Sequence, residues 1–183
     1  TAETIANAMM AKHWLNRHGV DAGPAMVAVT AAGTRAEVWG INPDHIFAFA
    51  DGIGGRYSVW SSVGLSVMIA IGSENFSRML AGAHAMDCHV QHTELAQNIA
   101  VIMGLLRVWC RRYLKLPAYG LIPYEQRLTS LPAWAQQLEM ESNGKSVDRQ
   151  GHLLLLPAGP LIWGAAGTNA QHSFFQWLHQ SVD

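Results

Sequence analysis

Short hydrophobic runs alternate with longer segments of helical spacing along most of the chain. The runs at residues 25–30, 45–50, 119–124 and 161–163 are too short for helices and predict buried strands. Apolar residues at helical spacing predict helices between and around these runs, at residues 2–18, 34–39, 93–113 and 132–142 and from about 167 to 179. Strands that alternate with helices predict an α/β fold in which mainly parallel sheets are flanked by helices.

Boundary residues support several of these helices. Gly19 is a stop signal for the first helix and Gly40 for the second, because glycine readily ends a helix. Pro132 fits the first turn of the fourth helix, and Asn143 with Gly144 fits its end. These signals predict helix ends to within a few residues.

Composition then narrows the class of protein. Half of the 183 residues are hydrophobic, 14% are charged, and the net charge is −1. Because there is no basic excess, we expect no nucleic-acid partner. The longest apolar stretches, at 63–72 and 153–164, are too short or too interrupted to span a membrane. With only two cysteines and no segment that resembles a secretory signal, the sequence predicts a cytoplasmic globular protein of one domain, or one plus part of another.

A glycine-rich loop follows the second expected strand. Gly52, Gly54 and Gly55 precede Arg56, and serines at 61 and 62 can cap the next helix. Glycines let backbone amides approach an anion, and an arginine adds positive charge. The loop lacks the lysine ending of a Walker A motif and the full spacing of a dinucleotide fingerprint. It is therefore either an anion-binding loop or a tight turn whose arginine pairs with a carboxylate.

Gln137 and Glu141 are four residues apart, so they share one face of the expected helix. Glu141 lies in the last turn, where the negative end of the helix dipole disfavours a charged carboxylate. A carboxylate tuned in this way suits a general base that removes a carbon-bound proton. The alternative is a structural ion pair between Glu141 and Lys145, which the spacing alone favours.

His172 is a second candidate for acid–base chemistry. Thr168 and Gln171 have the spacing of a capping box, which predicts that His172 lies in the first turn of its helix. The positive end of a helix favours the neutral imidazole that such chemistry often requires. The alternative is a surface or packing histidine, since the chain has nine histidines.

A metal site is a further alternative. His84, Cys88 and His92 recur at intervals of four, which would align them on one face of a helix as ligands for zinc. However, there is no second Cys/His pair at zinc-finger spacing. We therefore expect no metal ligands in this chain.

Several longer motifs together resemble the glucose-6-phosphate isomerase family. They occur in the family's order at residues 54–61, 82–87, 119–126, 137–145, 159–164 and 167–174. The first contains Gly54-Gly55-Arg56-Tyr57-Ser58, and the fourth contains Met140-Glu141-Ser142-Asn143-Gly144-Lys145. The resemblance covers nearly the whole chain, so it is far more specific than a single short pattern.

The resemblance implies reversible isomerisation of glucose 6-phosphate and fructose 6-phosphate, in glycolysis and gluconeogenesis, without a metal or cofactor. His172 matches a family histidine that helps to open the sugar ring. Glu141 matches the glutamate that moves a proton between C2 and C1 through a cis-enediol. Arg56 matches an arginine that stabilises the developing negative charge, and Gln137 matches a glutamine that holds the substrate. Thr1 matches the end of the family's phosphate-binding loop. A sugar-phosphate-binding module without turnover, on the same fold, remains the alternative.

The resemblance also implies sugar-isomerase (SIS-like) domains that are incomplete in this chain. Residues 1–73 match the later part of a first domain, and residues 74–183 match connecting helices and the first part of a second. Family members are homodimers in which the histidine that matches His172 enters the partner's active site. Most of the phosphate loop and a catalytic lysine have no match in this chain, which resembles the middle of the family's sequence. We therefore expect uncovered sheet edges and exposed apolar surface.

Overall fold

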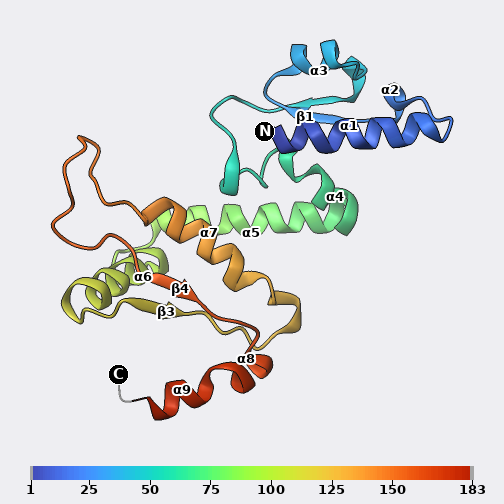
Figure 1. Cartoon of the computed structure of the whole chain (residues 1–183). Coiled ribbons are helices and arrows are strands. Elements are labelled where there is room, and N and C mark those ends of the chain that lie inside the picture. Colours follow the sequence, from blue (N-terminus) through green and yellow to red (C-terminus); the bar gives the residue numbers. More distant parts are fainter. Residues whose placement is uncertain (1, 182–183) are drawn as a thin grey trace. The chain divides into compact units, whose positions relative to one another are not determined.

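A computed structural model describes residues 2–181 and divides the chain into two compact units that meet between Ala85 and Met86. Within the described residues, each unit contains one two-stranded parallel sheet and several helices (Figure 1). The predicted α/β class with mainly parallel sheets is therefore confirmed. The unit boundary lies inside α5 (Ser73–His92), so the assignment of residues 1–73 and 74–183 to two sugar-isomerase domains stays a prediction.

The first unit is built around a parallel pair of strands. In chain order its elements are α1 (Ala2–Arg17), α2 (Ala22–Ala25), β1 (Ala28–Thr30), α3 (Gly33–Trp39), β2 (Ile46–Ala48) and α4 (Leu65–Ile71). Val29 of β1 pairs with Phe47 of β2, and α3 forms the crossover between the strands. Gly40 closes α3 as predicted, with a φ of 103° in the left-handed region that glycine adopts without strain.

The first predicted strand begins later than expected. The side chain of Asp21 accepts a hydrogen bond from the amide of Gly23 at 3.0 Å and starts the short helix α2. This local cap competes with extended backbone, so β1 covers only the last three residues of the predicted run.

The segment between β2 and α4 contains two 3-10 turns, at Gly55–Tyr57 and Ser62–Gly64. The hydroxyl of Ser61 accepts from the amide of Val63 at 3.3 Å and so caps the second of these turns. The N-cap residue of α4 itself is Gly64 and no side chain caps this helix, so the serine cap lies one turn earlier than predicted. A Cβ atom at Gly64 would lie 2.7 Å from the ring of Phe76, a buried residue at the start of α5. The loop therefore packs closely against that helix.

The second unit also has a parallel pair of strands. After the end of α5, its elements are α6 (Ile99–Val108) with a π turn at Trp109–Tyr113, β3 (Ala118–Gly120), a 3-10 turn at Gln126–Leu128, α7 (Leu131–Asn143), β4 (Leu161–Trp163), α8 (Gly167–Ser173) and α9 (Phe175–Gln180). Tyr119 of β3 pairs with Ile162 of β4. Helix α7 and strand β4 lie close to their predicted positions.

Three predictions in this unit need correction. The helix expected from residue 93 begins at Ile99, because buried Asn98 accepts from the amide of Val101 and donates to the carbonyl of Val90 at 3.0 Å. The strand expected over 119–124 covers only Ala118–Gly120. The last helix is interrupted at Phe174, which separates α8 from α9.

Much apolar surface is uncovered, as expected. The 20.0-kDa chain exposes 13809 Å². A compact protein of this mass exposes roughly 8,700 Å², and two separate units of half the mass would expose roughly 10,500 Å². Exposed apolar side chains are concentrated on α6, where Leu105 and Leu106 are more than half exposed. Among the described helices, none has the length and hydropathy needed to cross a bilayer.

Candidate functional site

Gln137 and Glu141 lie one turn apart near the end of α7, and both residues are exposed. Pro132 occupies the first turn of this helix, and Gly144 closes it by donating from its amide to the carbonyl of Met140 at 2.7 Å. Residues four apart share a face of a helix. The structure therefore presents an amide and a carboxylate side by side, where a ligand from solvent can reach them.

Helix α7 is fixed to β4 through polar contacts with Ile162, which is 1% exposed. Gln136 donates from Nε2 to the carbonyl of Ile162 at 3.0 Å, and the amide of Ile162 donates to Sδ of Met140 at 3.4 Å. Farther along the helix, Cβ of Asn143 lies 3.1 Å from the position that a Cβ atom at Gly159 would take. Helix and strand therefore run in opposite directions, and Glu141 lies beside residues 159–162 at the amino end of β4.

Lys145 contacts the backbone of Glu141. Its ammonium group donates to the main-chain carbonyl of Glu141, in the last turn of α7. A cation at this end of a helix stabilises the unpaired carbonyl groups there. Because this contact uses only the backbone of Glu141, it is compatible with a chemical role for the carboxylate.

His172 lies beyond the opposite end of β4. It is exposed on α8, which three residues separate from the end of the strand. The predicted capping box is wrong, because Ala166 is the N-cap residue and no side chain caps this helix. Since α8 has only seven residues, His172 falls in its last turn rather than its first. The argument from the positive helix end therefore does not apply to His172.

The described part of the second unit thus does not bring Glu141 and His172 into one site. Figure 1 shows the C-terminal end of α7 at one end of the β4 arrow and α8 at the other. One copy of this unit can present the carboxylate and the imidazole only as two separate groups.

Arg56 belongs to the first unit, in the 3-10 turn Gly55–Tyr57. Gly55 has a φ of 65°, and the hydroxyl of buried Ser58 donates to the carbonyl of Gly55 at 2.6 Å. These features hold the backbone on both sides of the half-buried arginine. A Cβ atom at Gly52 or Gly54 would meet no atom within 4 Å, so the loop before the turn is open. Thr1 lies outside the described residues.

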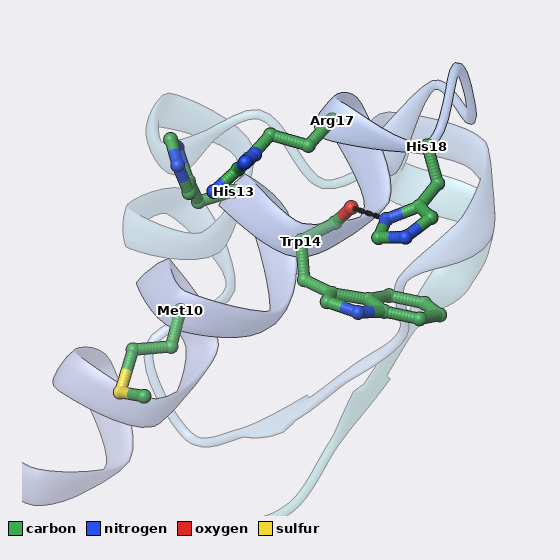
Figure 2. Close-up of a pocket in the computed structure, with 5 residues that line it drawn as sticks. All are labelled: Met10, His13, Trp14, Arg17 and His18. Carbon is green, nitrogen blue, oxygen red and sulfur yellow. Dashed lines mark hydrogen bonds between the residues drawn. The ribbon is translucent and has the colours of Figure 1, made fainter.

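Two hollows in the described part of the chain contain none of the predicted site residues. One of about 360 Å³ is formed by side chains of α1 and of His18, the residue that follows this helix, as Figure 2 shows. Its lining residues are Met10, His13, Trp14, Arg17 and His18. In it, the ring of His18 lies 4.5 Å from that of Trp14, with Nδ1 2.7 Å from the carbonyl of Trp14. A surface formed by one helix and the residue that follows it cannot enclose a ligand, so it is not a candidate site for the isomerisation chemistry.

The zinc alternative finds no support in the described chain. His84, Cys88 and His92 all lie on α5, but Nδ1 of His92 is 2.9 Å from the carbonyl of Cys88 and so interacts with its own helix. Among residues 2–181, no three His, Cys, Asp or Glu side chains lie close enough together to hold a metal ion.

The comparison with known families decides the assignment. The family model for phosphoglucose isomerase matches residues 1–183. The chain belongs to the phosphoglucose isomerase family. Curated relatives named glucose-6-phosphate isomerase include those of Chlorobium luteolum, 48% identical over 187 residues, and Xanthobacter autotrophicus, 50% identical over 185 residues. Each match covers 100% of this chain and 34% of the relative, so the chain spans about a third of their length.

Solved structures agree with the family assignment. The crystal structure of a glucose-6-phosphate isomerase from Chlamydia trachomatis is 37% identical to this chain and superposes on it with a TM-score of 0.90. The match covers 100% of this chain and 35% of that one. The resemblance inferred from the motifs is therefore confirmed, and the short parallel sheets belong to the family's sugar-isomerase fold.

Proposed function

We propose that the protein catalyses the reversible isomerisation of glucose 6-phosphate and fructose 6-phosphate, as part of glycolysis and gluconeogenesis. The proposal depends on Glu141, an exposed carboxylate on a helix that is fixed to β4, within a chain that matches the family over its whole length. A base for carbon acids needs such a fixed and accessible position.

Glu141 would take the proton from C2 of open-chain glucose 6-phosphate, and the C–H electrons would form the C1–C2 double bond of a cis-enediol. The π electrons of the C1 carbonyl would move to O1, which takes up a proton, and the hydroxyl on C2 gives up its proton when C1 is protonated in the next step. Return of the proton to C1 gives fructose 6-phosphate, so the reaction is an internal redox exchange and needs no external electron acceptor. Gln137, one turn away, would hold the substrate. Arg56 would stabilise the negative charge of the intermediate, and Thr1 would contact the phosphate.

His172 would open the sugar ring in the active site of a second copy of the chain. Glu141 and His172 lie at opposite ends of β4, which supports a homodimer whose active sites are shared. The large exposed apolar surface is typical of a protein–protein interface and is consistent with such a dimer. We place this activity in the cytoplasm, where reduced thiols such as Cys88 and Cys110 are common.

Glu141→Gln tests the proposal, because it keeps the shape of the side chain and removes the base. Turnover of fructose 6-phosphate should fall by more than about a hundredfold, while binding of the sugar phosphate persists. Turnover equal to that of the parent protein would exclude Glu141 as the base. Binding without turnover in the parent protein itself would instead favour a sugar-phosphate-binding module.

A further inference from the structure

Glu139 lies two residues before Glu141 on α7, and its side chain is 18% exposed. Its carboxylate has two partners. Oε2 forms an ion pair with Nη1 of Arg107 on α6, and Oε1 accepts from Nδ2 of Asn143 at 2.9 Å. One carboxylate therefore binds both Arg107 of the neighbouring helix and Asn143 in the last turn of its own helix.

Further contacts extend this network to the sheet. The guanidinium carbon of Arg107 lies 5.4 Å from the ring centroid of Tyr119 on β3. Arg111, one turn along from Arg107, donates from Nε to the carbonyl of Gly159 at 3.2 Å. Gly159 in turn lies against Asn143, where a Cβ atom would be 3.1 Å from Cβ of Asn143. The last turn of α7 thus contacts α6 and the residues before β4, and the arginine that binds it also contacts β3.

Glu139 and Glu141 point to different sides of α7. At about 100° per residue, two positions differ by about 200° around the helix axis. The inner side of the last turn can therefore be anchored by Glu139 while the outer side presents Glu141. The last turn of α7 needs contacts outside the helix to hold its position, because the final carbonyl groups of a helix lack helical partners and the last turn tends to fray.

We propose that Glu139 is a positioning residue for Glu141, acting through its contacts with Arg107 and Asn143. The inference rests on the proposed function, because it assumes that Glu141 transfers the proton. A displacement of about 1 Å at a reacting group can cost about a hundredfold in rate. Loss of the anchor should therefore affect the proton-transfer step far more than substrate binding.

The test compares Glu139→Gln and Glu139→Asp in the natural full-length protein, with glucose 6-phosphate carrying hydrogen or deuterium at C2. For Glu139→Gln we expect kcat to fall about 10- to 100-fold and KM to change less than about threefold. The deuterium isotope effect on kcat should rise, because proton abstraction becomes more rate-limiting. Glu139→Asp keeps the charge and should recover part of the loss.

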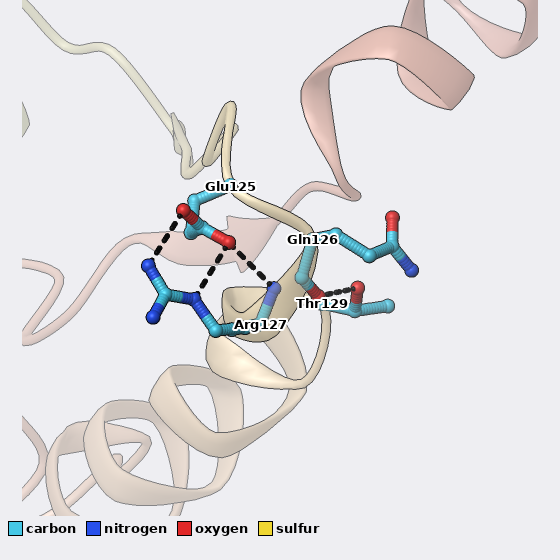
Figure 3. Close-up of polar contacts among 4 residues, drawn as sticks. All are labelled: Glu125, Gln126, Arg127 and Thr129. Carbon is cyan, nitrogen blue, oxygen red and sulfur yellow. Dashed lines mark hydrogen bonds and ion pairs between the residues drawn. The ribbon is translucent and has the colours of Figure 1, made fainter.

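A matched control is available in Glu125, whose carboxylate forms an ion pair with Arg127 at 3.0 Å, outside α7 (Figure 3). Glu125→Gln removes an ion pair of the same chemistry and should leave kcat and the isotope effect unchanged. Arg107→Lys is a second variant that keeps the charge of the partner and loses its planar fork. Arg107→Lys should lower kcat in the same direction as Glu139→Gln, but by a smaller factor. It therefore tests the same contact even if Glu139→Gln fails to fold.

The outcomes separate the two hypotheses. If Glu141→Gln abolishes turnover while Glu139→Gln and Arg107→Lys keep the kcat of the parent protein, the positioning role is wrong and the proposed function stands. If the Glu139 variants lose kcat with an unchanged isotope effect, the residue is merely structural and the inference is also overturned. If Glu141→Gln keeps full turnover, the proposed function itself fails.

Discussion

The side-chain amide of Gln171 on α8 donates a hydrogen bond to the hydroxyl of Tyr124 at 2.8 Å, across 47 residues of sequence. Two further contacts join the same segments. The amide of Gly167 donates to the carbonyl of Pro123 at 2.8 Å, and a Cβ atom at Gly167 would lie 2.6 Å from the ring of Tyr124. The loop after β3 therefore supports the helix that carries His172.

Removing the hydroxyl of Tyr124 should loosen α8. We expect Tyr124→Phe and Gln171→Ala each to lower the free energy of unfolding by about 0.5–1.5 kcal/mol, the usual net value of one hydrogen bond. Because both changes remove the same bond, the double variant should cost less than the sum of the two. Urea unfolding of the four proteins measures this coupling. Strictly additive effects would show that the bond contributes nothing.

Gly164 should tolerate no side chain. Its φ is 148°, and a Cβ atom there would lie 1.9 Å from the carbonyl oxygen of Leu121. Gly164→Ala must therefore separate the two segments that follow β3 and β4, at an expected cost of at least about 3 kcal/mol of unfolding free energy.

Gly104 is the matched control, because a Cβ atom at this position in α6 would meet no atom within 4 Å. Gly104→Ala should stabilise the second unit by about 0.5–1 kcal/mol, since alanine has the higher helix propensity. Both changes can be compared by urea unfolding. A similar cost for the two variants would contradict the close contact at Gly164.

The sequence predicted best what depends on neighbouring residues. Helix α7, with Pro132 in its first turn and Gly144 at its end, follows from local signals, and so does strand β4. Other predictions failed where a side chain contacts another element, while the late start of β1 comes from the local cap at Asp21. Asn98 binds the end of α5 and delays α6, and Tyr124 holds α8 where a capping box was expected.

The candidate site divides in the same way. The motifs around Glu141 and Arg56 could be found from the sequence, because each is a continuous run of residues that resembles the family. The contact between Glu139 and Arg107 could not be predicted, since the two residues are 32 positions apart and no periodicity connects them. Nor did the sequence indicate that Glu141 and His172 lie at opposite ends of one strand.

The turn at Asp148 should open in acid. Its Oδ1 accepts from the amides of Gln150 and His152, both at 2.9 Å, and its Oδ2 lies 3.4 Å from Nδ1 of His152. The backbone amide of His152 is the main cause that lowers the pKa of Asp148 below its ordinary value of 3.8. Because the pKa is lowered in the folded state, the charged carboxylate stabilises the turn fully at any pH above the ordinary pKa of 3.8. This contribution is lost as the pH falls through the lower pKa of the folded state.

NMR titration of the amide protons of Gln150 and His152 measures this effect. Both should shift together, with a midpoint below pH 3.8. Asp148→Asn is the control, because its side-chain oxygen still accepts from the amides but does not titrate. A midpoint at or above the ordinary value would show that the turn does not depend on the charged carboxylate.

Mixing two inactive variants should restore activity if the active sites are shared between copies. Glu141→Gln and His172→Ala would each remove one group from every site of a homodimer. In a mixed dimer, however, the intact Glu141 of one copy meets the intact His172 of the other, while the second site carries both changes. Random exchange of equal amounts makes half of the dimers mixed, each with one intact site, so about a quarter of the parent activity should return.

The measurement requires dissociation and reassociation of the mixture, followed by an assay of fructose 6-phosphate turnover. Each variant treated alone is the control and should stay inactive. If Glu141 and His172 acted within one copy, every site in a mixed dimer would still lack one group, and no activity would return. The opposite placement of these residues along β4 favours the first result. A single unit that keeps α7 on β4 and α8 on the loop after β3 cannot bring the two groups together without breaking one of these contacts.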